Sequence, residues 1–301
     1  MSDAAIVVDQ VSRSFGAKVA VNQVTLQVRR GECFGLIGPN GAGKTTFFAM
    51  LCGFLKPTSG TVRVLGADPR IPGALKGKLG VLPQDAALPG GLSVGRLLTY
   101  WASLSGLAPA DRHAREAVEK VGLMDAWNVD ARSLSHGMAK RIGLAQAFMG
   151  GAAVVLLDEP TAGLDPRSAA HVRSLIREVK AHATVVVSSH NLQELEELCD
   201  SAAILDRGRL AQAGTLAELT ARSAEFRVEL LGPAPLAQIQ ALDGVTGASM
   251  SGQQLVVLFD SRRRAPEEMI TATLELLIRG GVKILGVTRG KKLEERVLEL
   301  T

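Results

Sequence analysis

The sequence predicts an α/β protein with two domains, the larger built on buried parallel strands and the smaller an α+β arrangement at the C-terminal end. The chain has 301 residues, enough for about two domains. Between residues 33 and 190, short apolar runs alternate with segments of helical periodicity, as in a parallel sheet covered by helices. From about residue 223 the predicted order of elements changes to strand, helix, strand, strand, helix, strand.

Composition is that of a folded globular protein. Hydrophobic residues make up 47% and charged residues 21%, which excludes wholesale disorder and fibrous repeats. No run of 18 residues is free of charge, so we expect no membrane span, and the acidic N-terminus does not resemble a secretory signal. A net charge of +4 is weak evidence for nucleic acid. The three cysteines lack metal spacing and are expected to be reduced, buried thiols.

The N-terminal segment predicts antiparallel strands that lead into a buried strand. Residues 5–8 and 19–28 alternate apolar and polar side chains, with Gly16 and Asn22 as breaks. Residues 33–37 form an apolar run that enters a glycine-rich loop, and residues 46–55 have the pattern of the helix that should follow it.

The glycine-rich loop has the phosphate-binding pattern, in which Gly38 and four further residues precede Gly43, Lys44 and Thr45. Its glycines allow backbone N–H groups to point at phosphates, and the helix N-terminus adds attraction for the anion. Lys44 is expected to reach the β- and γ-phosphates, and the Thr45 hydroxyl to bind Mg²⁺. The flanking strand and helix disfavour the alternative, a glycine-rich turn with an exposed lysine.

Strands are expected at residues 61–65 and 79–82, the second ending close to Gln84. Three segments then carry apolar residues at helical spacing, which predicts an all-helical insertion: residues 92–107, 111–123 and 135–149.

A further apolar strand, residues 153–157, ends in two carboxylates, at the edge where parallel sheets carry functional groups. Asp158 is placed to hold Mg²⁺, and Glu159 to accept a proton from the attacking water. Taken alone, the pair could be an exposed acidic strand end. Asp165 is expected to cap a helix that begins at Pro166. His190, after the strand at residues 184–188, could donate to the γ-phosphate, although a lone histidine is more often an ordinary polar group.

The order of these motifs resembles the ATP-binding subunit of ABC transporters over residues 4 to about 216. That resemblance implies a P-loop NTPase core with an antiparallel β subdomain and an inserted α-helical subdomain. The matching motifs are residues 38–45 (Walker A), 81–84 (Q-loop), 134–138 (signature), 154–159 (Walker B), 162–165 (D-loop) and 188–190 (switch histidine).

In that family two subunits pair head to tail and enclose two ATP molecules. The resemblance implies that Ser135 and Gly137 contact the γ-phosphate of ATP on the partner, as suits an anion site at a helix N-terminus. It also implies that Phe15 stacks on adenine, although Phe15 could equally be a core residue. Gln84 would link the metal and the attacking water to the membrane partner, and Asp165 would tune the opposite site.

The implied site residues fall into three groups. The catalytic residues are Lys44, Gln84, Glu159 and His190. The residues that contact ATP are Phe15, Gly38, Pro39, Asn40, Gly41, Ala42, Gly43, Lys44, Thr45, Thr46, Ser135, Gly137 and Asp165. The metal ligands are Thr45, Gln84 and Asp158.

One motif departs from the family pattern. The signature, usually Leu-Ser-Gly-Gly-Gln, here has His136 and Met138 in place of the first glycine and the glutamine. Because Ser135 and Gly137 remain, we expect the ATP sandwich to survive. His136 could titrate near neutral pH, but a solvated surface position is favoured.

The predicted boundaries are residues 1–220 for the ATP-binding domain, with a helical subdomain at about 85–150, and residues 221–301 for a ferredoxin-like βαββαβ domain. The second domain resembles the C-terminal extension of drug, polysaccharide and sodium exporter ATPases. Its expected strands are residues 226–231, 245–250, 255–259 and 282–287, and its expected helices are residues 235–242, 266–278 and an amphipathic stretch at 293–300.

The resemblance implies an ATP-hydrolysing subunit that powers a separate transmembrane permease, most often for export, on the cytoplasmic face of the membrane. ATP and Mg²⁺ are the expected cofactors, and the expected partners are the permease and a second copy or a related ATPase, without nucleic acid. Two alternatives stay open: an ABC ATPase that acts on ribosomes or nucleic acid, and a ligand-sensing role for the C-terminal domain.

Overall fold

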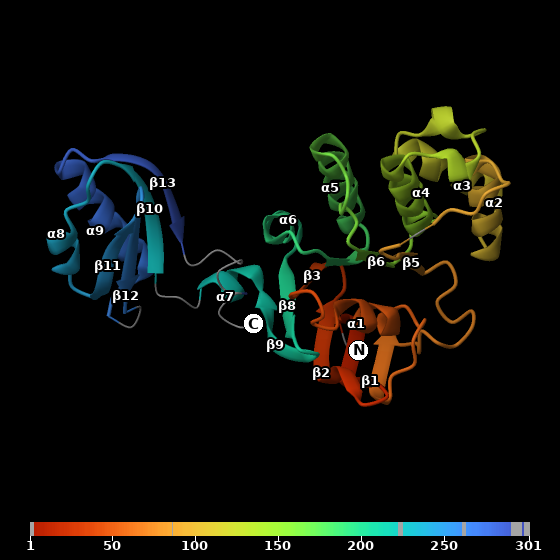
Figure 1. Cartoon of the computed structure of the whole chain (residues 1–301), viewed down its shortest axis with the longest axis horizontal. Helices are drawn as coiled ribbons and strands as arrows, with labels where there is room; N and C mark the ends of the chain where they lie inside the picture. Colours follow the sequence, from red (N-terminus) through yellow and green to blue (C-terminus); the bar gives the residue numbers. More distant parts are fainter. Residues whose placement is uncertain (1–2, 86, 222–224, 261–262, 290–296, 298–301) are drawn as a thin grey trace. The chain divides into compact units, whose positions relative to one another are not determined.

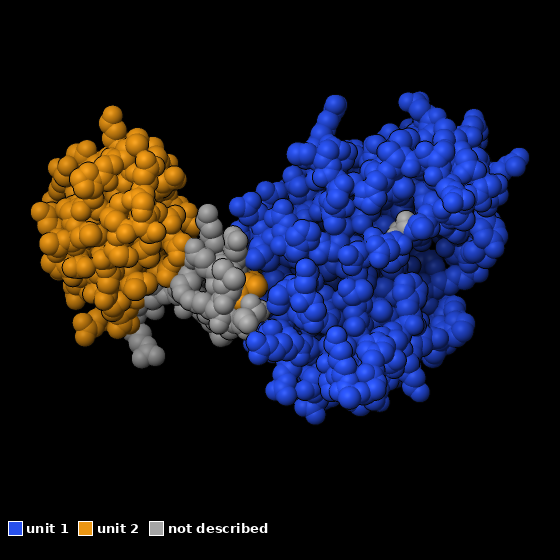
Figure 2. Space-filling view, viewed as in Figure 1, with its two compact units in different colours: residues 1–215, 300–301 blue, residues 216–299 orange. Residues whose placement is uncertain are grey.

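A computed structural model describes residues 3–85, 87–221, 225–260, 263–289 and 297. The chain divides into two compact units, residues 1–215 with 300–301 and residues 216–299 (Figure 2). The division falls after residue 215, whereas the predicted domain boundary lies after residue 220. Among the described residues, no helix is both long enough and apolar enough to span a bilayer.

The first unit begins with an antiparallel sheet of order β2-β1-β4, formed by β1 (Ala4–Phe15), β2 (Lys18–Arg29) and β4 (Ser59–Val64). Gly16 turns the chain between β1 and β2 at φ +57°, as the predicted break requires. The predicted break at Asn22 is wrong, because β2 passes through this residue. Register shifts between the Val11, Arg13 and Ser14 pairs absorb the irregularity without ending the strand.

A six-stranded sheet of order β5-β6-β7-β3-β8-β9 forms the centre of the first unit. All neighbours are parallel except the edge strand β9, which is antiparallel to β8. Every residue of β3, β6 and β7 is buried, as expected for strands covered on both faces. The strands are β3 (Cys33–Ile37), β5 (Leu79–Leu82), β6 (Val154–Asp158), β7 (Thr184–Ser188), β8 (Ser201–Asp206) and β9 (Arg209–Thr215).

The bounds of β3, β5 and β7 match the prediction, whereas β8, β9 and the short helix α6 (Leu192–Leu198) were not predicted. Helix α1 (Lys44–Leu51) begins two residues before and ends four residues before the predicted helix at 46–55. The early end has a local cause: Gly53 adopts φ +75°, and a Cβ there would lie 2.3 Å from the Pro69 carbonyl oxygen. The three cysteines are free and buried, as predicted.

The helical insertion consists of α2 (Val94–Leu104), α3 (Ala110–Lys120) and α4 (His136–Phe148), each shorter than predicted by a few residues. These helices lie together, apart from the β1, β2 and β4 sheet (Figure 1). Between β6 and β7, α5 (Pro166–Lys180) begins at the predicted cap, Asp165.

The second unit contains α7 (Leu216–Ala221) and then the predicted order of strands and helices. These elements are β10 (Glu225–Leu231), α8 (Leu236–Gln240), β11 (Val245–Ser251), β12 (Gln254–Phe259), α9 (Pro266–Arg279) and β13 (Lys283–Arg289). The sheet order β11-β12-β10-β13, antiparallel throughout, is the ferredoxin-like topology. The predicted helix at 293–300 lies outside the described residues except for Val297, which is buried.

Candidate nucleotide site

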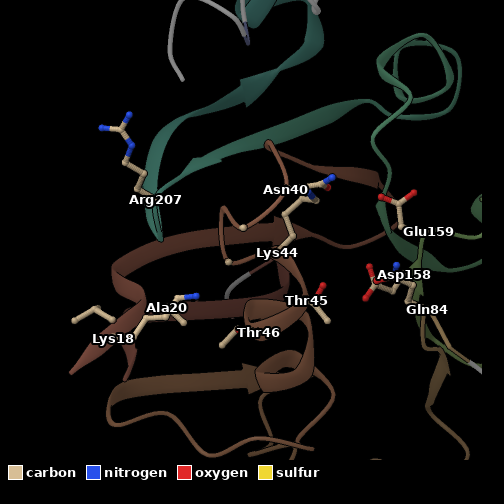
Figure 3. A pocket seen from close by; sticks show the side chains of 13 residues that line it. Lys18, Ala20, Asn40, Lys44, Thr45, Thr46, Gln84, Asp158, Glu159 and Arg207 are labelled. Carbon is tan, nitrogen blue, oxygen red and sulfur yellow. The ribbon is translucent and has the colours of Figure 1, made fainter. Parts of the chain in front are cut away.

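A cavity of about 420 Å³ lies where the glycine-rich loop meets the carboxyl ends of the parallel strands (Figure 3). Asp158, Glu159, Gln84 and Thr45 lie toward one end of it, and Lys18 and Arg207 lie toward the other (Figure 3). Its lining consists of Lys18, Val19, Ala20, Asn40, Gly41, Gly43, Lys44, Thr45, Thr46, Gln84, Asp158, Glu159 and Arg207. The cavity therefore unites five segments that are far apart in the sequence.

The loop is pressed between β2 and β8, and this close approach explains its glycines. Gly43, the residue before α1, adopts φ +97°, and a Cβ there would lie 2.3 Å from the Ala20 carbonyl oxygen. A Cβ on Gly38 would lie 2.4 Å from the Leu205 carbonyl oxygen. The Gly208 amide, in the turn after β8, donates to the Ala42 carbonyl at 3.0 Å. Larger residues at 38 and 43 would push the loop away from its neighbours.

Lys44, the first residue of α1, is 9% exposed. Its Nζ donates to the carbonyl oxygens of Gly38 at 2.6 Å and Pro39 at 3.1 Å. Burial lowers the pKa of this ammonium, and the carboxylates of Glu159 and Asp158 oppose the shift. The loop therefore holds a desolvated cation beside two acids, which suits it to receive a phosphate chain.

Asp158 is the last residue of β6 and Glu159 follows it, and both side chains are buried. Asp158 accepts a hydrogen bond from Ser188 Oγ at the end of β7. Burial raises the pKa of Asp158, against the effects of that hydrogen bond and of the nearby lysines. Glu159 adopts φ +50°, an uncommon conformation for a residue other than glycine, and its amide donates to the Ser188 carbonyl at 3.1 Å. Such strain is typical of functional positions.

His190 contacts Glu159 directly. Its Nδ1 lies 2.8 Å from Glu159 Oε2, and the His190 side chain is 68% exposed against 10% for Glu159. His190 does not line the cavity itself. The structure therefore connects this predicted residue to the site through the carboxylate that we expected to act as the base.

The oxygen-bearing side chains fit a magnesium ion. Thr45, Gln84 and Asp158 all line the cavity and offer a hydroxyl, an amide and a carboxylate, the ligand classes that Mg²⁺ prefers. A cation beside Asp158 would offset the cost of burying that carboxylate. Among the described residues, no group of three or more His, Cys, Asp and Glu side chains is arranged to hold a metal ion.

Several predicted residues do not line the cavity. Phe15 is 48% exposed, with the Arg13 guanidinium 4.6 Å from its ring centre. Ser135 caps α4 and accepts from the Met138 amide at 3.3 Å. The remaining predicted residues outside the lining are Gly38, Pro39, Ala42, Gly137, Asp165 and His190.

Asp165 caps α5 by accepting hydrogen bonds from the Arg167 and Ser168 amides at 3.1 and 3.0 Å. These bonds, chiefly those from Ser168, hold the pKa of Asp165 below its ordinary value. The predicted cap is therefore confirmed.

Sequence reasoning missed four lining residues: Lys18, Val19, Ala20 and Arg207. Arg207 adopts φ +45° in the turn between β8 and β9. Neither of these two strands was predicted. These residues belong to no motif, and only the pairing of distant strands brings them to the cavity. The Arg207-Gly208 pair, a common turn composition, was the one available local signal.

Comparison with known proteins adds independent information. Residues 21–162 match the family model described as ABC transporter. The chain is similar to the linearmycin resistance ATP-binding protein LnrL of Bacillus subtilis, with 30% identity and coverage of 97% of each chain. It is also similar to the Nod factor export ATP-binding protein I of Paraburkholderia xenovorans, with 35% identity over 79% of this chain and 80% of the relative.

A solved structure described as the ATP-binding subunit of an ABC transporter has the same fold over most of its length. It superposes with a TM-score of 0.67 and 29% identity, covering 71% of this chain and 91% of that one.

Proposed function

This chain belongs to the family of ABC transporter ATP-binding proteins, which hydrolyse ATP, and on that premise we propose that it powers an exporter whose permease is a separate polypeptide. The observation that carries the proposal is the cavity that unites the phosphate loop, Gln84 and the two carboxylates at the end of β6, Asp158 and Glu159. Export is supported by relatives named for linearmycin resistance and Nod factor export. Through the permease, the chain would lie on the cytoplasmic face of the membrane.

The proposed chemistry uses this chain's own groups at both ends of the phosphate chain. Backbone N–H groups of the loop and Lys44 bind the β- and γ-phosphates. Glu159 accepts a proton from the attacking water, and His190, whose Nδ1 lies 2.8 Å from Glu159 Oε2, holds the carboxylate in place. We assign to the other ring nitrogen of His190 a contact with the γ-phosphate. Thr45, Gln84 and Asp158 would hold Mg²⁺, which supplies positive charge to the phosphates when bound.

The residues outside the cavity support a head-to-tail dimer. Ser135 and Asp165 each cap a helix, and Gly137 lies in the first turn of α4, so all three stand at helix N-termini suited to anions. We assign Ser135 and Gly137 to the γ-phosphate of ATP bound by a second subunit, beside the partner's loop. Because one chain carries both halves, two copies complete two identical sites.

The test of the proposal is Glu159→Gln, which keeps the size of the side chain and removes the base. We expect ATP hydrolysis to fall by on the order of 100-fold or more while the affinity for ATP is retained. Glu178→Gln, an exposed glutamate on α5, is the matched control and should hydrolyse at the wild-type rate. Phosphate release measures the rate, and titration with a fluorescent ATP analogue measures affinity.

If the Glu159→Gln protein hydrolysed ATP at the wild-type rate, Glu159 would not be the base. Affinity purification from membranes tests the transport assignment. Recovery of a polytopic membrane protein with the chain supports the exporter, whereas recovery of ribosomes or nucleic acid would favour the non-transport alternative.

A further inference from the structure

Lys140 is a buried cation that the proposed chemistry does not use. It lies in α4, the helix capped by Ser135, and is 6% exposed. Lysine is almost never buried to this extent unless it is paired. Its Nζ donates to the backbone carbonyl of Gln84 at 3.3 Å, although the two residues are 56 positions apart. The ammonium therefore bridges the helical insertion and the segment that carries a predicted metal ligand.

The charges around Lys140 are those of the nucleotide site. Burial lowers the pKa of its ammonium, and the carboxylates of Asp158, Glu159 and Asp85 oppose that shift. Of the two lysines that stabilise ionised Asp158, Lys140 has the larger effect and Lys44 the smaller. The carboxylate pair is thus influenced by two buried cations, one at the phosphate loop and one in α4.

A second hollow, of about 260 Å³, also borders Gln84. It is lined by Gln84, Asp85, Ala87, His136, Ala139 and Lys140. Gln84 lines both this hollow and the nucleotide cavity. Because Gln84 borders both hollows, the hydrogen bond from Lys140 to its backbone carbonyl is a contact that can fix its position.

We propose that Lys140 is a positioning residue that holds the Gln84 segment against α4, opposite the Asp158 and Glu159 carboxylates, and so transmits nucleotide binding to the helix that carries Ser135. This inference rests on the proposed function, because it takes those carboxylates as the site of hydrolysis. An apolar side chain at position 140 could fill the same space, since buried charges are weak contributors to stability. An apolar side chain could not, however, interact electrostatically with the carboxylates of the nucleotide site.

The chain provides its own reporter for the test. Both of its tryptophans, Trp101 in α2 and Trp127, lie within the helical insertion. Their fluorescence should change when MgATP binds to the wild-type protein. In Lys140→Met, which keeps an unbranched side chain one atom shorter and removes the charge, we expect that change to be lost and kcat to fall about tenfold. The affinity for a fluorescent ATP analogue without Mg²⁺ should stay within about twofold of wild type.

Two further variants separate positioning from packing. Lys140→Arg keeps the charge and should restore at least half of the fluorescence change and of kcat. Lys120→Met removes an exposed lysine from α3 in the same insertion and should behave as wild type. Thermal unfolding of each variant shows whether a loss of kcat merely follows a loss of stability.

The inference is overturned if Lys140→Met retains the fluorescence change and kcat, if the wild-type protein shows no change with MgATP, or if Lys140→Arg fails to recover either property. Glu159→Gln, measured alongside, separates this failure from that of the proposed function. An active Glu159→Gln protein contradicts the proposed function, whereas an inactive one together with an unaffected Lys140→Met contradicts only the role of Lys140.

Discussion

The six-stranded sheet of the first unit and the four-stranded sheet of the second bury their side chains in different ways. In the first unit, all five residues of β6 and of β7 are buried, whereas in the second unit buried and exposed or half-buried positions alternate along β12. A parallel strand covered on both faces has no solvent-facing side along its length, so polar groups can gather only where it ends. The alternating strand instead has a whole face for polar groups.

Buried charge follows the same division. In the first unit Lys44, Asp158 and Glu159 are buried around the nucleotide cavity, and Lys140 is buried in the neighbouring hollow that Gln84 also lines. Burial raises the pKa of Asp158. In the second unit, Glu225 is 3% exposed but lies 2.8 Å from the guanidinium of Arg227. A buried charge held by a close partner serves the fold, whereas a group of buried charges around a cavity is poised for a ligand.

The largest effect on ATP binding is expected at the phosphate loop, where the first unit differs most from the second. Gly43→Ala should weaken ATP binding by on the order of 100-fold, because its Cβ would meet the Ala20 carbonyl in a conformation strained by about 1–3 kcal/mol. Gly41→Ala is the matched variant: its φ is +82°, but a Cβ there meets nothing within 4 Å. We expect the ATP affinity of Gly41→Ala to fall by about tenfold at most. Equal losses in the two variants, measured by titration with a fluorescent ATP analogue, would contradict the packing argument.

In the second unit the main effect should fall on stability alone. Leu277, in α9, is fully buried in the core with Phe226 and Val228. Leu277→Ala should lower the free energy of unfolding of that unit by about 2–5 kcal/mol and leave ATP affinity unchanged. Urea unfolding followed by circular dichroism, with a parallel ATP titration, checks both. A matching loss of ATP affinity would show that the two units are more closely coupled than this contrast allows.

The smallest effect concerns the cost of the buried carboxylate. Burial raises the pKa of Asp158 above its ordinary 3.8, so ionisation disfavours the folded state once the pH exceeds that value. The cost is absent at low pH and complete above the folded-state pKa. Asp158→Asn should therefore raise the free energy of unfolding by about 1 kcal/mol near neutral pH, while magnesium-dependent hydrolysis is lost.

The Asp158 prediction is checked by urea unfolding at pH 5 and pH 8 without nucleotide. The free energy of unfolding of the Asn variant should exceed that of the wild type by at least as much at pH 8 as at pH 5. A variant less stable than wild type at pH 8 would mean that pairing with Lys140 and Lys44 outweighs the cost of burial.

Local patterns were sufficient for much of the fold and for the residues beside the phosphates. The bounds of β3 and β7 follow from continuous apolar runs, and the loop from its glycine spacing. Local patterns failed at Asn22, where cross-strand pairing carries β2 through the predicted break, and at Gly53, where contact with Pro69 ends α1 early.

The sequence by itself determined which residues can bind phosphate and accept a proton, because the loop, Asp158 and Glu159 each lie within a short stretch of local pattern. Only the tertiary structure decided what surrounds them. It placed Lys140 against Gln84, 56 positions away, brought Arg207 to the cavity, and left Phe15 and Ser135 outside the lining. Periodicity records the neighbours of a residue along one element, whereas contacts between distant elements depend on how strands pair and helices pack.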